Sequence, residues 1–344
     1  MREEMNLEKA REIIKAVAEQ PRQFLFGLDQ VIDDCMIGLF ARAPYSAANG
    51  REKCYGQGHI LLMSVPGTGK TELASALAAA MDAKYQRIQG VPDLLPSAVT
   101  GSLVFDQKTR EFKMMPGPIF GHVVLIDELN RIIPKTKSAI LQPMEERAVT
   151  IGEAVYPLME VAATTERFFW VLATANPIES EGTYPLTEAE LDRFFMRIRI
   201  NYPDRDSEMK ISAESLRGKV IKRVANPAMI MEVARFITDY VKKGSLVDKY
   251  VVEIFDASRP ERSQLKEVLQ YIEVGISPRN EFQMKAAAVT RAFLRGGDTV
   301  LPDDVKYVAR LVLPHKLVLK PQAQAQKITP DEILELILDK TPVP

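Results

Sequence analysis

The sequence predicts an α/β fold: a three-layer αβα domain with a mostly parallel sheet, followed by a smaller all-α domain. Five short apolar runs have the length and composition of buried strands, and helical patterns lie between several of them. After Tyr202-Pro203 the pattern becomes helical, from about residue 205 to residue 313. We therefore expect an αβα domain with N-terminal helices at 1–203 and an all-α domain with a C-terminal tail at 204–344.

The individual elements follow from periodicity and from residues that break it. Strands are expected at 59–65, 85–89, 123–127, 168–174 and 195–200. Apolar residues recur at helical spacing over 4–19 and 28–42, and an Ala- and Leu-rich segment at 72–83 predicts a third helix. The polar, glycine-containing segment 44–58 is interpreted as a loop of unassigned use.

Composition excludes several classes of protein. The 344 residues are 46% hydrophobic, which fits a globular chain with two cores, and 45 basic against 46 acidic residues give a net charge of -1. There is thus no overall basic bias toward nucleic acid or an anionic membrane. Cys35 and Cys54 lack CxxC spacing, so neither a disulfide framework nor a zinc site is indicated. No apolar run approaches the ~20 residues of a membrane span and no secretory signal pattern is visible, so we expect a cytoplasmic protein.

A glycine-rich loop joins the first strand to the third helix. The eight positions from Ser64 to Thr71 follow the P-loop pattern, with Ser64 in place of its first glycine. Backbone N–H groups of such a loop surround the β-phosphate, the lysine reaches the β and γ oxygens, and the final hydroxyl binds Mg²⁺. The candidate nucleotide-binding residues are Val65, Pro66, Gly67, Thr68, Gly69, Lys70, Thr71 and Glu72. The alternative is a glycine-rich turn that binds nothing, which the flanking strand and helix disfavour.

An apolar strand that ends in two carboxylates supplies the second half of the site. Asp127 can hold Mg²⁺ together with Thr71, and Glu128 can orient and polarise the water that attacks the γ-phosphate. A glutamate directly after the metal-binding aspartate favours hydrolysis by water over transfer to a second substrate. An apolar strand ending in Asp-Glu is common by chance, but it is far more specific downstream of a P-loop.

Two further residues are candidates because of where they stand. Asn176 follows the strand 168–174, where an amide can help to place the attacking water; the alternative is a simple Asn-Pro turn. Arg193 ends a short helix before the last strand and would point away from its own P-loop, so any catalytic role is as an arginine finger for a neighbouring subunit. The alternative is an arginine in an ordinary surface ion pair.

Together these motifs resemble the MoxR family of AAA+ ATPases, P-loop NTPases. The resemblance covers about 25–320 and is most specific in RIQGVPDLLPSAVTG, in the run GPIFGHVVLIDELNRIIPKTKSAILQPMEERAVTIG and in ANPIESEGTYPLTEAELDRF. It implies Lys70 and Thr71 as Walker A residues, Asp127 and Glu128 as Walker B, Asn176 as sensor 1 and Arg193 as the trans-acting finger. It also implies Arg279, in GISPR, as a sensor-2 arginine that binds the nucleotide of its own subunit, and Phe26-Gly27 as neighbours of the adenine, with Leu28 where the family has glutamine. Leu313-Pro314-His315-Lys316-Leu317 resembles the segment that closes the family's lid.

The resemblance further implies an assembly and a role. Family members carry an insert in a helix after the second strand and a hairpin before sensor 1, here at 92–113 and 149–164, which line the central pore or one face of a ring. ATP and Mg²⁺ are the implied cofactors, a hexameric ring of identical subunits the implied assembly, and chaperone-like remodelling the implied role. Partners in the family often bear a von Willebrand factor A domain. No nucleic acid and no membrane segment are expected.

Two other classes of function remain open. A nucleic-acid motor would share all of these ATPase motifs, but no helix-turn-helix, zinc finger or Arg-rich tail is visible. A regulatory scaffold that binds ATP without hydrolysing it is the third possibility, although such a protein requires neither Glu128 nor Arg193.

Overall fold

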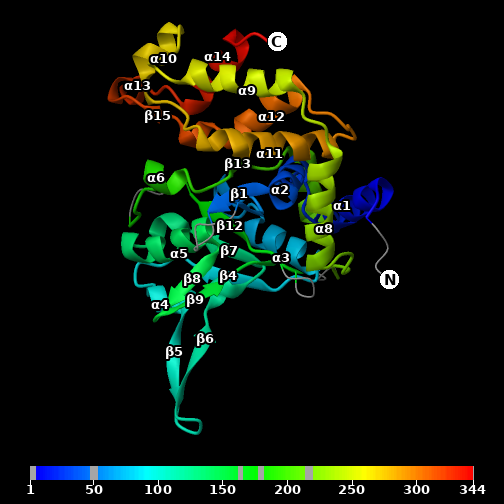
Figure 1. Ribbon diagram of the computed structural model, residues 1–344, viewed down its shortest axis with the longest axis vertical. Coiled ribbons are helices and arrows are strands. Elements are labelled where there is room, and N and C mark those ends of the chain that lie inside the picture. The colour runs from blue at the N-terminus through cyan, green and yellow to red at the C-terminus, as the bar shows by residue number, and fades with distance from the viewer. Residues whose placement is uncertain (1–4, 47–52, 162–165, 177–181, 214–219, 344) are drawn as a thin grey trace.

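The computed structural model describes residues 5–46, 53–161, 166–176, 182–213 and 220–343. A single parallel sheet forms the centre of the larger domain, with the strand order β13-β3-β12-β7-β4 (Figure 1). Its strands are β3 (Ile60–Ser64), β4 (Tyr85–Gln89), β7 (Val123–Asp127), β12 (Trp170–Ala175) and β13 (Met196–Ile200). All five expected strands are therefore confirmed. Because every pair is parallel, the carboxyl ends of the strands lie at one edge of the sheet and the amino ends at the other.

Helices cover this sheet and bury it. The elements are α1 (Leu7–Arg22), α2 (Asp29–Phe40), α3 (Lys70–Ala80) and α5 (Pro134–Glu146), of which α2 packs against β13 and α3 against β7. Asn6 sets the start of α1, because its side chain accepts a hydrogen bond from the Lys9 backbone at 2.9 Å. All residues of β12 are buried, as expected for a strand covered on both faces.

Short antiparallel hairpins extend from the domain. The segment 44–58, interpreted from sequence as a loop, contains the hairpin β1 (Ala43–Ser46) and β2 (Lys53–Gly56); its residues 47–52 lie outside the described chain. The expected hairpin at 149–164 corresponds to β8 (Ala148–Ile151) with β9 (Ala154–Pro157), followed by the separate pair β10 (Glu160–Val161) and β11 (Glu166–Arg167). Residues 162–165 between β10 and β11 also lie outside the described chain.

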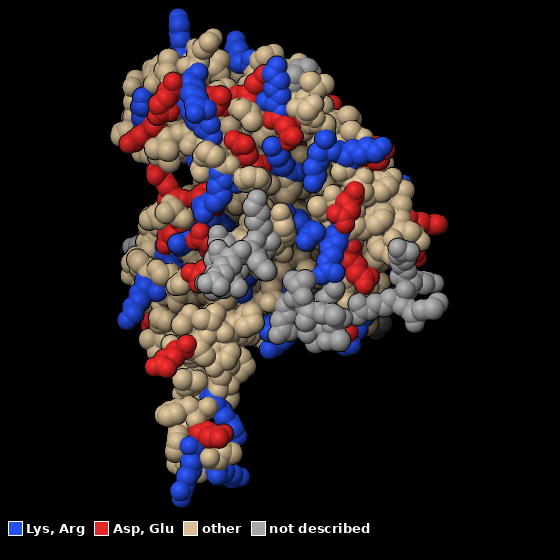
Figure 2. Space-filling view, viewed as in Figure 1, with Lys and Arg blue, Asp and Glu red and all other residues tan. Residues whose placement is uncertain are grey.

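The insert expected at 92–113 forms a short helix, α4 (Pro96–Thr100), and a long hairpin. The hairpin strands are β5 (Gly101–Asp106) and β6 (Glu111–Pro116), and they project from the body of the protein (Figure 1). Phe105 and Phe112 face each other on it, 5.3 Å apart at their ring centroids, and both are exposed. Figure 2 shows basic side chains at its tip.

Among its described residues, the second domain is helical apart from one small ribbon and an isolated bridge between Lys242 and Thr299. Its helices are α7 (Arg205–Ala213), α8 (Pro227–Tyr240), α9 (Ser245–Ser258), α10 (Lys266–Tyr271), α11 (Arg279–Leu294), α12 (Pro302–Val312), α13 (Pro321–Ala325) and α14 (Pro330–Lys340). The expectation of helices throughout 205–313 missed β14 (Ile272–Val274), which pairs with β15 (Val318–Leu319). The tail beyond 313 is folded, since Thr329 and Glu332 form a capping box at the start of α14. The domain boundary at Pro203 stays a prediction.

The two domains share an interface near the N-terminus. Helix α11 packs against α2 and β1. The Tyr307 hydroxyl of α12 donates a hydrogen bond to Asp34 of α2. None of the described helices is both long and apolar enough to cross a membrane.

Candidate active site

The loop between β3 and α3 has a backbone conformation that suits a phosphate. Gly67 and Gly69 have φ of +78° and +77°, which side-chain-bearing residues rarely adopt. A Cβ at Gly67 would meet nothing within 4 Å, so the backbone angle rather than lack of space favours glycine there. Helix α3 begins at Lys70 without a side-chain cap, which leaves its first backbone N–H groups for an anion. The loop therefore fits the phosphates of a nucleotide.

Side chains of the same loop hold its base together. Thr68 donates its hydroxyl hydrogen to the Ser64 hydroxyl at 3.1 Å, and Ser64 donates to the Val65 carbonyl at 3.1 Å. Nζ of Lys70 lies 3.4 Å from the same carbonyl oxygen, so the amine is inside the loop. Of the other expected residues, Pro66 and Glu72 are exposed and Thr71 is half-buried.

The segment expected beside the adenine lies next to this loop. A Cβ at Gly69 would be 3.3 Å from a Leu25 methyl and 3.7 Å from a Leu28 methyl. Gly27 has a φ of +77° and lies against Pro203 and Ser207, where the second domain begins. Phe26-Gly27 is thus between the P-loop and the start of the helical domain, a position that suits the base of a nucleotide.

The two carboxylates lie at the carboxyl end of β7, two strands away from β3 in the sheet. Asp127 is the last residue of β7, and Glu128 has left-handed angles, φ 55° and ψ 52°, which turn it out of the strand. Thr174 of the intervening strand β12 donates its hydroxyl hydrogen to Oδ1 of Asp127 at 2.8 Å and accepts from the Glu128 backbone N–H at 2.8 Å. A single buried hydroxyl therefore fixes both residues of the pair.

Three more side chains contact the carboxylates, and the sequence did not single them out. Arg87 Nη2 lies 2.6 Å from Oδ2 of Asp127, while Gln89 and Arg131 donate to Oε2 of Glu128 at 3.2 and 3.1 Å. Arg87 and Gln89 belong to β4, which is the strand paired with β7. The sequence signal that could have identified Arg87 and Gln89 is their spacing of two residues on a strand next to the Asp-Glu strand. With Thr174, they form the immediate surroundings of Asp127 and Glu128, the candidate hydrolytic pair.

Asn176 follows the strand between these two parts of the site. It comes directly after β12, which pairs with β3 on one side and β7 on the other. Its backbone carbonyl accepts a hydrogen bond of 3.5 Å from Asn130. The residues after it, 177–181, lie outside the described chain.

Arg193 lies at the opposite edge of the sheet. Phe195, two residues later, donates its backbone N–H to the His59 carbonyl, just before β3 begins. The P-loop follows the other end of β3, whose 5 residues span roughly 16 Å at about 3.3 Å each. Helix α6 (Glu188–Leu191), capped by Thr187, places Arg193 there. Arg193 therefore points away from its own P-loop, as the sequence predicted.

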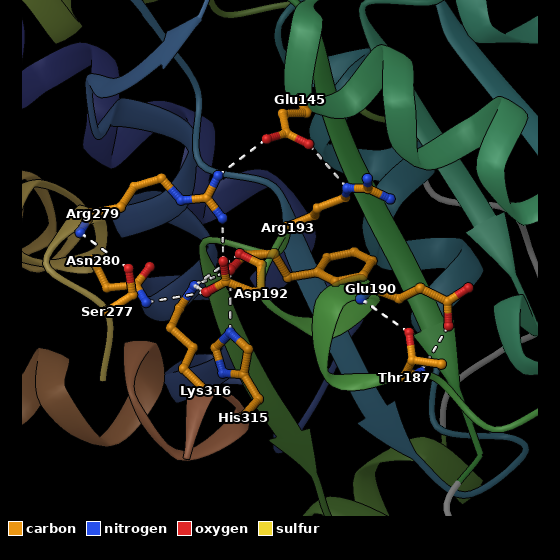
Figure 3. Close-up of polar contacts among 11 residues, drawn as sticks. Glu145, Thr187, Glu190, Asp192, Arg193, Ser277, Arg279, Asn280, His315 and Lys316 are labelled. Atoms are coloured by element: carbon orange, nitrogen blue, oxygen red, sulfur yellow. Dashed lines mark hydrogen bonds and ion pairs between the residues drawn. The ribbon is translucent and has the colours of Figure 1, made fainter. Parts of the chain in front are cut away.

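Arg279 lies beside Arg193 and not beside its own P-loop. Its Nη1 is 3.1 Å from Oε1 of Glu145, and Nε of Arg193 is 3.0 Å from Oε2 of the same carboxylate (Figure 3). The end of α5 that carries Glu145 is fixed at the amino edge of the sheet, because His59 Nε2 contacts the Met144 carbonyl at 3.1 Å. The expected sensor-2 role at the nucleotide of the same subunit does not fit this arrangement. Helix α11 carries Arg279 on its first turn, and the packing of the helical domain, which no local pattern shows, sets its position.

Asp192 and Lys316 tie the Arg193 loop to the helical domain. Arg279 also forms an ion pair with Asp192, and the buried Lys316 donates to the carbonyls of Asp192 and Phe194 at 3.1 and 2.9 Å (Figure 3). Burial lowers the pKa of Lys316 to about 8. Burial alone would raise the pKa of Asp192, but Lys316, Asn280 and Arg279 together hold it below its usual value.

Comparison with known proteins points to one family. The model for the ATPase family associated with various cellular activities (AAA) matches residues 59–196, and the AAA lid domain model matches residues 266–337. The chain is 32% identical to the chaperone MoxR1 of Mycobacterium tuberculosis over 94% of this chain and 80% of that protein. The chain belongs to the MoxR family of AAA+ ATPases. It is also 39% identical to the uncharacterized protein YeaC of Bacillus subtilis over 84% of this chain and 86% of that one.

A solved structure extends the likeness to the whole fold. The crystal structure of a candidate ATPase from Cytophaga hutchinsonii superposes with a TM-score of 0.85 at 34% identity, covering 98% of this chain and 97% of that one. The αβα domain and the helical lid of a MoxR-family protein are thus both present. The chain is an ATP-hydrolysing enzyme, and the loop and carboxylates described above are its candidate site.

Proposed function

We propose that this MoxR-family protein hydrolyses ATP with Mg²⁺ as a closed ring of identical subunits and remodels partner proteins. One observation carries the proposal: the groups for hydrolysis lie at one edge of the sheet, and Arg193 and Arg279 lie at the other. A subunit alone therefore cannot bring Arg193 or Arg279 to its own γ-phosphate position. The arginines beside its own carboxylates, Arg87 and Arg131, are paired with Asp127 and Glu128. Contacts between unlike faces of identical subunits close into rings when the rotation allows, and every site in such a ring is complete.

Different residues of the chain bind the phosphates, hold the metal and orient the attacking water. Backbone N–H groups of Gly67 to Lys70 bind the β-phosphate, and the Lys70 ammonium neutralises the β and γ oxygens. Thr71 and Asp127 offer the hard oxygen ligands that Mg²⁺ prefers, and Mg²⁺ when bound neutralises charge on the phosphate oxygens. Glu128 orients the attacking water, and Asn176 helps to place it.

Both arginines act on the nucleotide of the neighbouring subunit in this proposal. Arg193 is the arginine finger, as expected from the family. Arg279 takes a revised role and joins it in trans, because it shares Glu145 with Arg193. Two guanidinium groups can then stabilise the negative charge that develops on the γ-phosphate oxygens.

Partner proteins are the proposed substrates. The relative from Mycobacterium tuberculosis is described as a chaperone, which supports a remodelling role here. The projecting β5–β6 hairpin exposes Phe105 and Phe112 and has the apolar surface that an unfolded segment of a partner could contact. A hexameric ring and a partner with a von Willebrand factor A domain remain predictions from the family.

The experiment is sedimentation with Mg²⁺, with and without a slowly hydrolysed ATP analogue. ATP should promote assembly, because a site made by two subunits links nucleotide affinity to association. A chain that stays monomeric at every nucleotide and protein concentration, yet hydrolyses ATP at full rate, contradicts the shared site. ATPase rates with DNA and with candidate partners separate remodelling from a nucleic-acid motor, since only the relevant class should stimulate turnover. A pull-down with Glu128→Gln, loaded with ATP, identifies the partner.

A further inference from the structure

Glu145 holds two arginines that come from different domains. Its Oε2 accepts from Nε of Arg193 at 3.0 Å, and its Oε1 accepts from Nη1 of Arg279 at 3.1 Å (Figure 3). Arg193 belongs to the αβα domain, and Arg279 opens helix α11 of the lid. The Glu145 carboxylate therefore links the two domains as well as the two arginines. In the described part of the chain, the Glu145 carboxylate contacts no other hydrogen-bond donor.

Asp192 is the second carboxylate of this cluster, and other groups anchor it as well. It pairs with Arg279, and it also accepts hydrogen bonds from Asn280 at 3.1 Å and from Lys316 at 3.5 Å. Two carboxylates thus face two guanidinium groups and the Lys316 ammonium group. Because the buried Lys316 also holds the backbone of this loop, Asp192 is fixed in place. Glu145 is therefore the carboxylate that the arginines can leave more easily.

The cluster can rearrange at small cost. The side chains of Arg193, Arg279 and Glu145 are 32%, 56% and 40% exposed, and ion pairs at such positions contribute only about 0–1 kcal/mol each. All four charged side chains border a cavity of about 690 Å³, which leaves the arginines room to reorient. A phosphate binds guanidinium through shorter, charge-assisted hydrogen bonds and carries more negative charge than one carboxylate.

We propose that Glu145, with Asp192, forms an ion-pair clasp that masks Arg193 and Arg279 in the free subunit. On assembly the arginines leave Glu145 for the phosphates of the nucleotide bound by the neighbouring subunit. The inference rests on the proposed trans role of the arginines. Its consequence is regulatory: the carboxylate competes with the neighbour's nucleotide and raises the ATP and protein concentrations at which the ring forms.

The test measures assembly rather than turnover. Glu145→Gln removes the competing charge and keeps the shape, so sedimentation should show half-maximal assembly at a roughly three- to tenfold lower concentration of the slowly hydrolysed ATP analogue. Glu146→Gln is the matched control, because Glu146 is the next residue on α5 and accepts from Gln142 instead of an arginine. It should assemble like the wild type.

Two outcomes overturn the clasp. Unchanged assembly of Glu145→Gln means that the carboxylate does not compete, and weaker assembly means that it positions the arginines for binding. In an Arg193→Ala, Arg279→Ala background, Glu145→Gln should have no further effect, since nothing is left to unmask. A failed trans role is distinguishable: Arg193→Ala, Arg279→Ala then assembles and hydrolyses ATP normally, whatever Glu145 does.

Discussion

Thr174 donates its hydroxyl hydrogen to Asp127 over 2.8 Å, from a strand that the sequence singled out only for the asparagine after it. The same oxygen accepts from the Glu128 backbone, and the Thr174 side chain is almost completely buried. Asp127, the carboxylate proposed to bind the metal, and the following Glu128 are therefore both fixed by their neighbour in the sheet.

Thr174→Val should therefore slow hydrolysis more than it weakens binding. Valine keeps the shape but leaves Oδ1 of Asp127 without its donor and the Glu128 N–H without its acceptor. We expect kcat to fall about 10- to 100-fold, as small misplacements of reacting groups do, with the Kd for ATP nearly unchanged. Unfolding should become easier by about 1–2 kcal/mol. Thr174→Ser, which keeps the hydroxyl, should recover most of the rate; equal losses in both variants would count against the hydroxyl's role.

Arg87 should weaken the affinity of the site for Mg²⁺. Its guanidinium lies 2.6 Å from the proposed metal-binding carboxylate and is 45% exposed, so its repulsion of the cation is worth about 1 kcal/mol or less. Arg87→Met should lower the Mg²⁺ concentration for half-maximal ATPase activity about three- to fivefold. Arg131→Met is the control, because Arg131 pairs with Glu128. A similar shift in both variants, or none in either, would exclude a specific effect at Asp127.

The Walker A and Walker B residues should fail in different ways. Lys70→Ala should abolish ATP binding, because the loop loses the charge that neutralises the β and γ oxygens. Glu128→Gln should bind ATP yet hydrolyse it very slowly, because the attacking water loses its base. Equilibrium binding of a fluorescent ATP analogue and steady-state turnover separate the two. Tight binding by the first variant, or near-normal turnover by the second, would remove the site assignment.

Asp34 predicts a pH-dependent stability at the interface between the domains. Burial raises the pKa of Asp34 from 3.8 to about 6, and the negative charge of Asp33 adds to the rise. Hydrogen bonds from Tyr307 and Gln30 and the positive charge of Arg291 oppose it. A raised carboxyl pKa means that the folded state holds the proton more tightly than the unfolded state does. The resulting contribution of Asp34 to the free energy of unfolding is full below about pH 4 and is lost as the pH rises through about 6.

Asp34→Asn should remove that dependence. At about 1.4 kcal/mol per pKa unit, the variant should be more stable than the wild type by about 2–3 kcal/mol at pH 7, with the difference vanishing near pH 4. Urea unfolding at several pH values measures it. A difference that is constant from pH 4 to pH 7 would show that protonation of Asp34 is not the cause.

Local signals were sufficient for most of the fold. The five sheet strands were predictable because buried strands are short apolar runs, and the P-loop because glycine is required at two left-handed positions, Gly67 and Gly69. The hairpin at 43–56 was not predictable, since its polar strands lie outside the main sheet and lack an apolar run. The ribbon of β14 and β15 was missed for a related reason: its partners are far apart in sequence and only 2 or 3 residues long.

The site was predictable only where chemistry is encoded in consecutive residues. Asp127 and Glu128 belong to one motif, whereas Thr174, Arg87 and Glu145 reach their partners through the pairing of strands and the packing of α5. The position of Arg279 beside Arg193 was not predictable, because a motif on a lid helix does not show which edge of the sheet the lid covers. The family resemblance identified Arg279 as a candidate residue, and the tertiary structure shows which residues surround it.

The most direct test of the shared site mixes two inactive variants. Arg193→Ala should reduce turnover roughly 10³-fold or more while leaving ATP binding nearly intact, as for other arginine fingers. Combined with Glu128→Gln subunits, some interfaces will pair an intact Glu128 with a neighbour's intact Arg193, so ATPase activity should partly return. A near-wild-type rate for Arg193→Ala, or no recovery in mixtures shown to co-assemble, would contradict the account and return Arg193 to the role of a surface ion pair.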